Sequence, residues 1–524
     1  MRSPARHNVS RRRGLRRRVF AAALAGLVLT SFAAPSLAVD RSTSPATAAE
    51  LDSFVQQQRS DLGLPGVAVV VLSKNVVMFE GAYGSAGPAG RPVTINTPFA
   101  LGSTSKQFTA LAVQQLIVQR RVTLVDTVGA LLPELSGGSS PFAGVTIAQL
   151  LSHTSGISTH EGDEEFNPWP SVTSIDDETR RVLQSQPVGP AGADFEYSNA
   201  NYTILGAIID HITGLSFEDA LQTLVVVPLR LTSTTSDERV AQSRGLADGY
   251  YPWFGAFSTA TPGAWWPMGA PSAFITSTAT DLTRVLQAQL GASSGIDAST
   301  LEASRTPLTR VDQYSQYASG WYVRPFWELH DNDENGLDPS LPTLWEHPGS
   351  TERSMSYLAF APSMGLGVVV LSNYALGTDQ DKLSRFTTAL LHKIVGTTDS
   401  PASVDALTSA APLLMVALPI VQLLMFGWLV FALARPRPSR VGRWMPLLVG
   451  GFVTIATVFI AVVVVPGRTG ASLFEPSWWN STPDLAVSVG VVLLFAVGWV
   501  VAFAVALLKR LVRRPSGVSD AVRS

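Results

Sequence analysis

A serine and a lysine stand three positions apart at Ser103 and Lys106, in the only S-x-x-K pattern of the chain. On a helix, positions i and i+3 share a face, so the hydroxyl and the amine would meet. A desolvated lysine can lose its proton, whereas an arginine effectively cannot. The chain prefers arginine and has only five lysines: Lys74, Lys106, Lys382, Lys393 and Lys509. A lysine retained at this spacing predicts a serine nucleophile that is served by an amine base.

A second group of polar residues, Tyr197 and Asn199, precedes an amphipathic pattern at residues 202–213. A phenol and an amide two positions apart on a loop can both point into one cleft. The alternative is a turn in which Asn199 caps the helix that follows.

A third group, His347-Pro348-Gly349-Ser350, stands just before the strand expected at residues 355–360. Proline and glycine favour turns, so the alternative is an ordinary turn that leads into this strand. Taken alone, the motif does not decide between residues of a cleft and a plain connection.

Apolar periodicity and turn residues indicate the elements that must position these groups. Helices are predicted at residues 47–62, 147–151, 202–213, 281–290 and 382–395, and another opens at Ser103. Strands are predicted at residues 66–72, 76–83, 320–324, 355–360 and 366–371. This order indicates an α+β fold, with one antiparallel sheet built from both ends of the exported region. The middle of the chain would form a helical lobe, and a cleft would lie between lobe and sheet.

Together and in this order, the three motifs resemble those of the penicillin-recognising serine hydrolases. This family includes class C β-lactamases, related D,D-carboxypeptidases and family VIII-like esterases. Supporting matches lie at residues 150–157, 277–282 and 320–321, and the resemblance extends over about residues 51–395. It implies a β-lactamase/transpeptidase-like fold, in which an antiparallel sheet flanked by helices accompanies a helical lobe.

The resemblance also implies a role for each motif residue. Ser103 would attack an acyl carbonyl and form an acyl-enzyme, while Lys106, sharing the task with Tyr197, takes the serine proton. Tyr197 would relay a proton to the leaving group and help to activate the deacylating water. Asn199 would hold a substrate amide, and the N–H of Ser350 would join that of Ser103 in the oxyanion hole. The other predicted substrate-binding residues, His347 and Gly349, would line the cleft.

The third motif departs from the class C pattern at two positions. His347 replaces the usual lysine and weakens the positive field, and Pro348 has neither a hydroxyl nor an N–H for a substrate carboxylate. Ser350 or Arg353 would have to compensate. We therefore rank ester, amide or cell-wall peptide hydrolysis above true β-lactamase activity.

Composition excludes several other chemistries. The formal net charge of −2 gives no reason to expect a nucleic-acid partner, and the absence of cysteine excludes disulfides, thiol catalysis and zinc thiolate sites. The acidic stretch 163–165 beside His160 fits no metal-ligand spacing and is interpreted as a solvated loop, so neither a metal nor a cofactor is expected. A G-x-S-x-G at 291–295 follows a helix, without the strand that a nucleophile elbow requires.

Both ends of the chain suggest export and membrane attachment. A basic, then apolar N-terminus is typical of a signal peptide, and three apolar runs near the C-terminus are long enough to span a bilayer. Basic residues after the first and third runs place those ends in the cytoplasm. The predicted organisation is a signal peptide (1–38), a hydrolase domain (39–396), a linker (397–410), three transmembrane helices (411–434, 445–465 and 485–508) and a basic cytoplasmic tail (509–524).

The leading hypothesis is therefore a multi-pass membrane protein of the cell membrane, with an extracytoplasmic serine hydrolase domain. Its partners would be a small-molecule or peptide acyl substrate and, through the three helices, membrane lipid. The alternative is a catalytically weak or silent protein that binds cell-wall peptide or a protein partner through the same cleft. A transport function is disfavoured, because the spans contain no ionisable residue.

Overall fold

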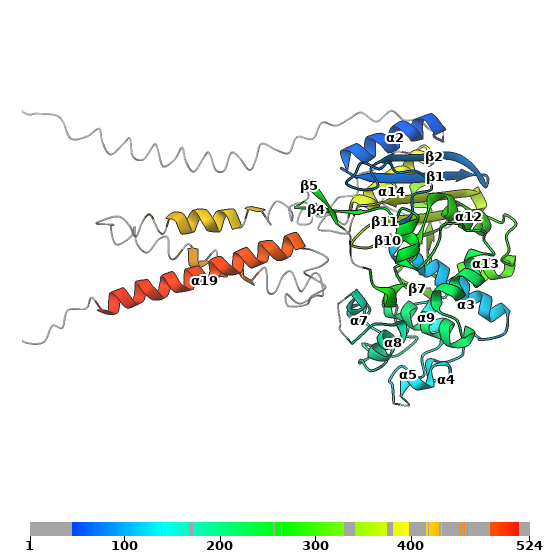
Figure 1. Ribbon diagram of the computed structural model, residues 1–524, viewed down its shortest axis with the longest axis horizontal. Coiled ribbons are helices and arrows are strands. Elements are labelled where there is room, and N and C mark those ends of the chain that lie inside the picture. The colour runs from blue at the N-terminus through cyan, green and yellow to red at the C-terminus, as the bar shows by residue number, and fades with distance from the viewer. Residues whose placement is uncertain are drawn as a thin grey trace, which may run out of the picture. The chain divides into compact units, whose positions relative to one another are not determined.

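The structure is a computed structural model (Figure 1). It describes residues 45–137, 139–166, 171–254, 257–261, 263, 265–329, 341–374, 381–397 and 483–512, with short helical pieces between 416 and 459. The predicted signal peptide, nearly all of the predicted linker, and residues 513–524 of the predicted tail lie outside the described residues.

An eight-stranded antiparallel sheet forms the frame of the domain, in the order β2-β1-β12-β11-β10-β9-β8-β7 (Figure 1). Its strands are β1 (Gly66–Ser73), β2 (Val76–Gly84), β7 (Thr309–Arg310), β8 (Gln316–Tyr317), β9 (Tyr322–Pro325), β10 (Thr343–Ser350), β11 (Met355–Ala361) and β12 (Leu366–Ser372). Two-stranded pairs are formed by β3 (Phe99–Ala100) with β6 (Thr276–Ser277) and by β4 (Gly249–Trp253) with β5 (Phe257–Thr261). Strands from the two ends of the described domain therefore lie side by side, because β1 pairs with β12.

The described domain also contains helices. They are α2 (Ala48–Asp61), α3 (Lys106–Val118), α4 (Val128–Leu131), α5 (Pro133–Ser136), α6 (Ile147–Leu151), α7 (Thr159–Asp163), α8 (Ile175–Leu183), α9 (Ala200–Thr213), α10 (Phe217–Leu221), α11 (Glu238–Ser243), α12 (Ala279–Gln289), α13 (Ala298–Arg305) and α14 (Asp381–Val395). Short 3₁₀ turns include η1 (Gly102–Ser105), η2 (Glu164–Phe166) and η5 (Trp327–Leu329). Local sequence sets several starts: Thr47 forms a capping box at α2, and Thr278 caps α12.

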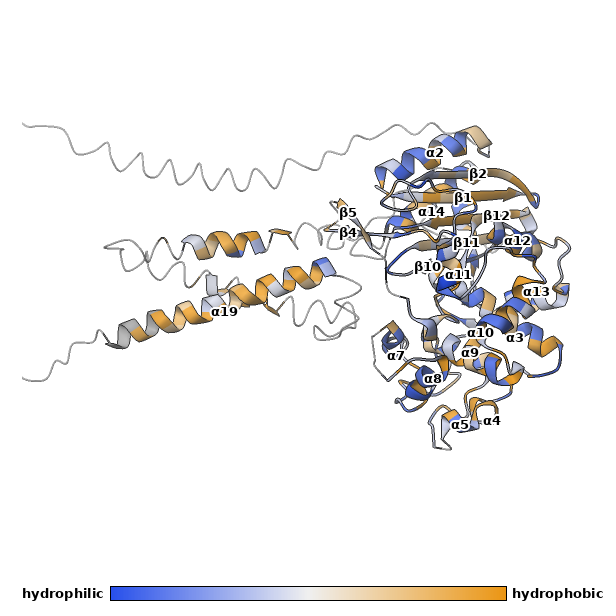
Figure 2. Cartoon of the chain, in the orientation of Figure 1, coloured by the Kyte–Doolittle hydropathy of each residue, from blue (hydrophilic) through white to orange (hydrophobic). Residues whose placement is uncertain are grey.

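Both faces of the sheet are covered, which explains the unbroken apolar runs of β1 and β12 (Figure 2). Successive side chains of a strand point to opposite faces. Val67, Val69 and Val71 accordingly pack with α2 and α14, whereas Ala68, Val70 and Leu72 pack with α3 and α12. Each fully buried valine or leucine contributes about 2 kcal/mol to this core.

The predicted α+β arrangement is confirmed, and the long predicted helices and strands lie within about two residues of their predicted bounds. One local expectation was wrong. The segment 347–350, expected before a strand, is itself the end of β10 and pairs with β11, with His347 opposite Leu358. Pro348 is tolerated here because β9 pairs with β10 only as far as Glu346, so the missing N–H breaks no bond to β9.

Near the C-terminus, α19 (Pro483–Val512) corresponds to the third predicted span. Its stretch Pro483–Val505 is long and apolar enough to cross a membrane, and Figure 2 shows it as mainly hydrophobic. A shorter apolar helix, Pro419–Trp428, lies within the first predicted span, and most of the second lies outside the described residues. The described part of the chain thus gives one candidate membrane helix, which is weak support for an anchor, and the three-helix module stays a prediction.

Candidate active site

Ser103 and Lys106 meet at the junction of η1 and α3. Lys106 Nζ donates a hydrogen bond to Ser103 Oγ at 3.2 Å. Residues i and i+3 of a 3₁₀ turn lie one above the other, so the turn brings the hydroxyl and the amine onto one side. The sequence spacing had predicted this contact on an α-helix. In the structure, Ser103 lies on the 3₁₀ turn η1, directly before α3.

Two glycines allow η1 to lie against the end of β10. Gly102 has φ +56°, and a methyl group on it would overlap the backbone nitrogen and carbonyl of Ser350. A methyl group on Gly349 would overlap the carbonyl oxygen of Leu101. This close approach brings the backbone of Ser350 beside the segment that carries Ser103.

Lys106 is fully buried, and its amine has three acceptors around it. Besides Ser103 Oγ, they are Asn199 Oδ1 at 2.7 Å and the carbonyl oxygen of Ser272 at 2.9 Å. Burial lowers the pKa of Lys106 to about 7, although Glu165 and Asp163 oppose the shift. A neutral amine would still donate to Asn199 and Ser272 and would direct its lone pair at the serine hydroxyl.

Tyr197 lies over the same amine, with Lys106 Nζ 5.0 Å from the centre of its ring. Burial raises the pKa of Tyr197 well above its usual range, although its hydrogen bond with Ser103 acts in the opposite direction. The phenol is therefore protonated at neutral pH. Lys106, whose pKa lies near 7, is better suited than Tyr197 to accept the serine proton.

His153 holds the Tyr197 loop in place. Its ring stacks on Tyr197 at 4.4 Å, and its Nδ1 accepts the N–H of Ser198 at 3.2 Å. Since Nδ1 is an acceptor, Nε2 carries the proton and donates to the hydroxyl of Tyr317 at 3.3 Å. Both ring nitrogens of His153 thus bond neighbouring groups of the protein, which fits a structural role in holding the loop.

Tyr317 connects His153 to His347. Its hydroxyl lies 3.1 Å from His347 Nε2, while His347 Nδ1 donates to the carbonyl oxygen of Pro348. His347 Nε2 is then the acceptor of the tyrosine proton. Burial and, to a smaller extent, the nearby Lys106 together lower the pKa of His347 to about 3, so the imidazole is neutral at pH 7. His347 thus adds no positive charge to the site.

Asn199 supports the lysine. Its Oδ1 accepts from Lys106, and its Nδ2 donates to Asp163 Oδ1 at 3.2 Å. No hydrogen bond from its side chain caps α9. The capping alternative for Asn199 is therefore wrong, and its amide belongs to the network around Lys106.

Sequence reasoning missed two residues that surround the lysine. Glu165, assigned to a solvated loop, is buried and accepts hydrogen bonds from Ser272 and from Thr203, the latter at 2.6 Å. Burial raises its pKa to about 8. The acidic run gave no signal for this burial, and the Ser272 carbonyl that contacts Lys106 is a backbone group, which no side-chain motif can reveal.

A cavity of about 530 Å³, here called the Ser103 cavity, opens at Ser103. Five of the seven predicted site residues line it: Ser103, Tyr197, His347, Gly349 and Ser350. Lys106 and Asn199 are buried and do not line it. The arrangement places the Ser103 hydroxyl at a cavity wall, with the Lys106 amine held behind it.

Comparison with known proteins gives the same family. The Beta-lactamase family matches residues 51–392, which is more than half of the chain. "Protein flp" of Staphylococcus aureus (strain COL) is 26% identical over 336 residues, a region that covers 62% of this chain and 62% of that protein. A "Beta-lactamase" of Escherichia coli (strain K12) is 28% identical over 383 residues, covering 68% of this chain and 95% of that protein.

Solved structures share the fold. A penicillin-binding protein homologue from Pyrococcus abyssi has a TM-score of 0.58 at 22% identity and covers 67% of this chain and 78% of its own. A class C β-lactamase from Rhodobacter sphaeroides has a TM-score of 0.55 at 24% identity, with 66% and 98% covered. The predicted β-lactamase/transpeptidase-like fold is confirmed, and the chain belongs to the beta-lactamase family.

Proposed function

We propose that the protein is a serine hydrolase that forms an acyl-enzyme at Ser103. The observation that carries the proposal is the contact between Ser103 Oγ and a fully buried lysine amine at the wall of a cavity. A buried amine with a pKa near 7 is a base at neutral pH, and the adjacent hydroxyl becomes a nucleophile when its proton is removed.

In the proposed reaction, neutral Lys106 takes the proton of Ser103 as its oxygen attacks the carbonyl carbon. The backbone N–H groups of Ser103 and Ser350 stabilise the oxyanion, and each such donor can contribute about 3 kcal/mol. The protonated Tyr197 passes its proton to the leaving group, and the phenolate that remains takes back the proton that Lys106 received from Ser103. Water then attacks the acyl-enzyme with the same groups working in reverse.

The proposed substrates are esters, amides or cell-wall peptides in preference to β-lactams. His347 is neutral at pH 7, and Pro348 lacks both a hydroxyl and an N–H. This part of the cavity is therefore poorly suited to a substrate carboxylate. Arg353, considered as a substitute cation, does not line the Ser103 cavity and lies within reach of Glu238 instead.

We further propose an extracytoplasmic domain attached to the membrane by the predicted C-terminal helices. The N-terminal signal pattern and the apolar α19 support this arrangement. Such a position would give the active site access to cell-wall material.

The test is hydrolysis by the full-length protein in detergent, using a short-chain p-nitrophenyl ester beside a chromogenic cephalosporin. We expect ester turnover to exceed cephalosporin turnover and to vanish in Ser103→Ala. Equal ester turnover in wild type and Ser103→Ala would refute the assignment of Ser103 as the nucleophile. Binding of cell-wall peptide without turnover of any substrate would instead favour the silent binding protein, which the unusual Pro348 makes a reasonable second candidate.

A further inference from the structure

The Ser103 cavity extends well beyond the catalytic groups. From Ser103 and Tyr197 its lining follows β10 and reaches α14, where Leu383, Ser384, Thr387 and Thr388 line it. The cavity can take this course because β9 pairs with β10 only at residues 343–346, which leaves the edge of 347–350 unpaired by β9. The cavity thus has a second end, away from the nucleophile.

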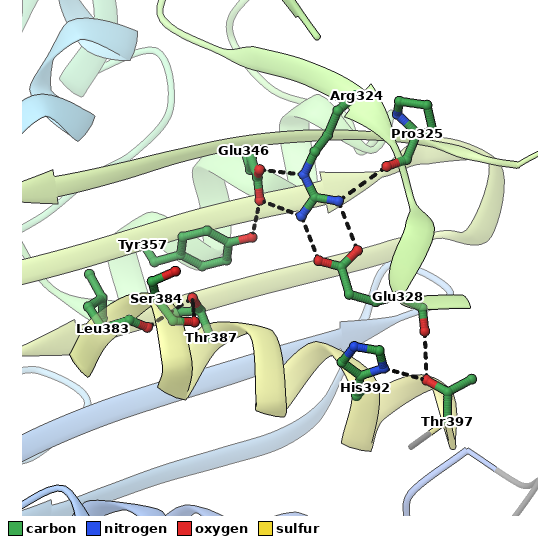
Figure 3. Close-up of polar contacts among 10 residues, drawn as sticks. All are labelled: Arg324, Pro325, Glu328, Glu346, Tyr357, Leu383, Ser384, Thr387, His392 and Thr397. Atoms are coloured by element: carbon green, nitrogen blue, oxygen red, sulfur yellow. Dashed lines mark hydrogen bonds and ion pairs between the residues drawn. The ribbon is translucent and has the colours of Figure 1, made fainter. Parts of the chain in front are cut away.

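A network of charged side chains lines this second end (Figure 3). Arg324 donates to Glu328 at 2.8 and 2.7 Å and to Glu346 at 2.5 and 3.0 Å, and Tyr357 also donates to Glu346. The ring of Trp327 covers the guanidinium at 4.2 Å. One arginine is therefore paired with two carboxylates, so these three side chains carry a net charge of −1.

The excess negative charge is accessible at Glu346. Its side chain is 17% exposed, against 7% for Arg324 and 2% for Glu328. Among the residues that the structure describes, Glu346 Oε1 accepts a bond from Arg324 Nε alone, so it retains acceptor capacity. The other ionisable residues among the described lining are His347, which is neutral, and three tyrosines, so the described wall holds no compensating cation.

We propose that the α14 end of the Ser103 cavity is a subsite for a protonated amine of the substrate, bound by Glu346. The inference rests on the proposed hydrolase function and adds the substrate class: esters or amides that carry a cationic group. Along β10, Glu346 lies three residues before Gly349 and points to the opposite face of the sheet, the face that α14 covers. A substrate would therefore pass the edge of 347–350 that β9 leaves unpaired, and its ammonium would sit roughly 10 Å or more from the scissile carbonyl. The hydroxyl groups of Ser384 and Thr388 would complete the polar lining at that end.

The test compares three p-nitrophenyl esters of equal length: an ω-aminooctanoate, the uncharged nonanoate and the half-ester of nonanedioate. We expect kcat/KM for the ammonium ester to exceed that for the nonanoate roughly tenfold, since a hydrogen bond to a charged group is worth at least that factor. The carboxylate ester should be the slowest. A second set of esters carries the ammonium, methyl or carboxylate end on the leaving alcohol instead of the acyl chain. Comparing the two sets identifies the side of the scissile bond that faces Glu346.

Matched variants locate the effect. In Glu346→Gln the preference for the ammonium ester over the nonanoate should fall close to unity. Glu80→Gln removes one exposed carboxylate from β2, four strands away from β10, and should keep the preference. Ser384→Lys adds a positive charge at an exposed position of α14 outside the ion network and should also reduce it, so the test survives if Glu346→Gln folds poorly.

The outcomes separate the two proposals. If no ester is hydrolysed in a Ser103-dependent way, the hydrolase function fails. Another outcome is Ser103-dependent hydrolysis with equal kcat/KM for the ammonium ester and its uncharged counterpart, both when the group is on the acyl chain and when it is on the leaving alcohol. That result would overturn the cation subsite and leave the hydrolase function standing. A preference that persists in both Glu346→Gln and Ser384→Lys also overturns the assignment to this end of the cavity.

Discussion

In the proposed mechanism, one proton on Lys106 decides whether Ser103 can be deprotonated. When the amine is charged it donates to all three of its neighbours, Ser103, Asn199 and Ser272, and has no lone pair to accept a proton. When it is neutral it can accept the proton of Ser103. Burial favours the neutral form, since the charged form loses its hydration. The function of this residue therefore depends on its surroundings as much as on its type.

Replacing Lys106 by arginine keeps the positive charge and removes the base. We expect Lys106→Arg to lower the rate of acylation by roughly a hundredfold or more, because a guanidinium does not lose its proton. The measurement is the pre-steady-state burst of p-nitrophenol from an ester. An Arg variant that acylates at the wild-type rate would rule out Lys106 as the base.

The pH dependence of kcat/KM should report the same proton. Burial lowers the pKa of Lys106 to about 7, so kcat/KM should rise with pH through that value and level off above it. Tyr197, whose pKa is raised, keeps its proton over this range and should add no alkaline fall there. A profile that is flat between pH 5 and 9 would contradict this assignment of the base.

At the scale of elements, the site depends on how closely η1 approaches β10. Gly102 permits the approach, since it combines a positive φ with backbone atoms of Ser350 where a side chain would begin. Ser103 and the strand that lines its cavity are thus held close together by a neighbouring residue with no side chain.

Gly102→Ala should therefore damage both stability and activity. The left-handed conformation alone costs about 1–2 kcal/mol in free energy of unfolding, and the overlap with Ser350 should add to it and displace Ser103. Gly63→Ala is the matched control, because Gly63 has φ +63° with no atom within 4 Å of the added methyl. Thermal unfolding and ester kcat should show Gly63→Ala destabilised but active, and Gly102→Ala both destabilised and slow. Equal kcat in the two variants would contradict a role for the close approach.

At the scale of the whole molecule, the proposed membrane attachment raises the question of which side of the membrane would carry the active site. The sequence puts basic segments after the first and third apolar runs, and α19 is the one described helix long enough to span. An extracytoplasmic active site and a cytoplasmic C-terminus are the proposed consequence.

The absence of cysteine makes this topology directly testable. Val188→Cys lies on the domain surface, where Val188 is 65% exposed, and Ser516→Cys lies in the predicted cytoplasmic tail. A membrane-impermeant maleimide should label Val188→Cys in intact cells and Ser516→Cys only after permeabilisation. The opposite labelling pattern would reverse the proposed orientation.

What the sequence determined by itself was local. The hydrophobic period and the caps predicted the long helices and strands, and the i, i+3 spacing predicted the contact of Ser103 with Lys106. These features depend on residues that are neighbours in the chain. The order of the three motifs also pointed to the family that the comparisons confirm.

Only the tertiary structure decided which groups act on those residues. The Ser272 carbonyl accepts a hydrogen bond from Lys106, and the charge of Glu165 acts on the lysine pKa, both from distant segments. Tyr317 joins His153, 164 positions away, to His347, 30 positions away. The strand at 347–350 was missed because proline and glycine indicate a turn, whereas β11 supplies the pairing. Burial sets the proton state of Lys106 and His347, and burial is a property of the packed chain that no single segment of sequence contains.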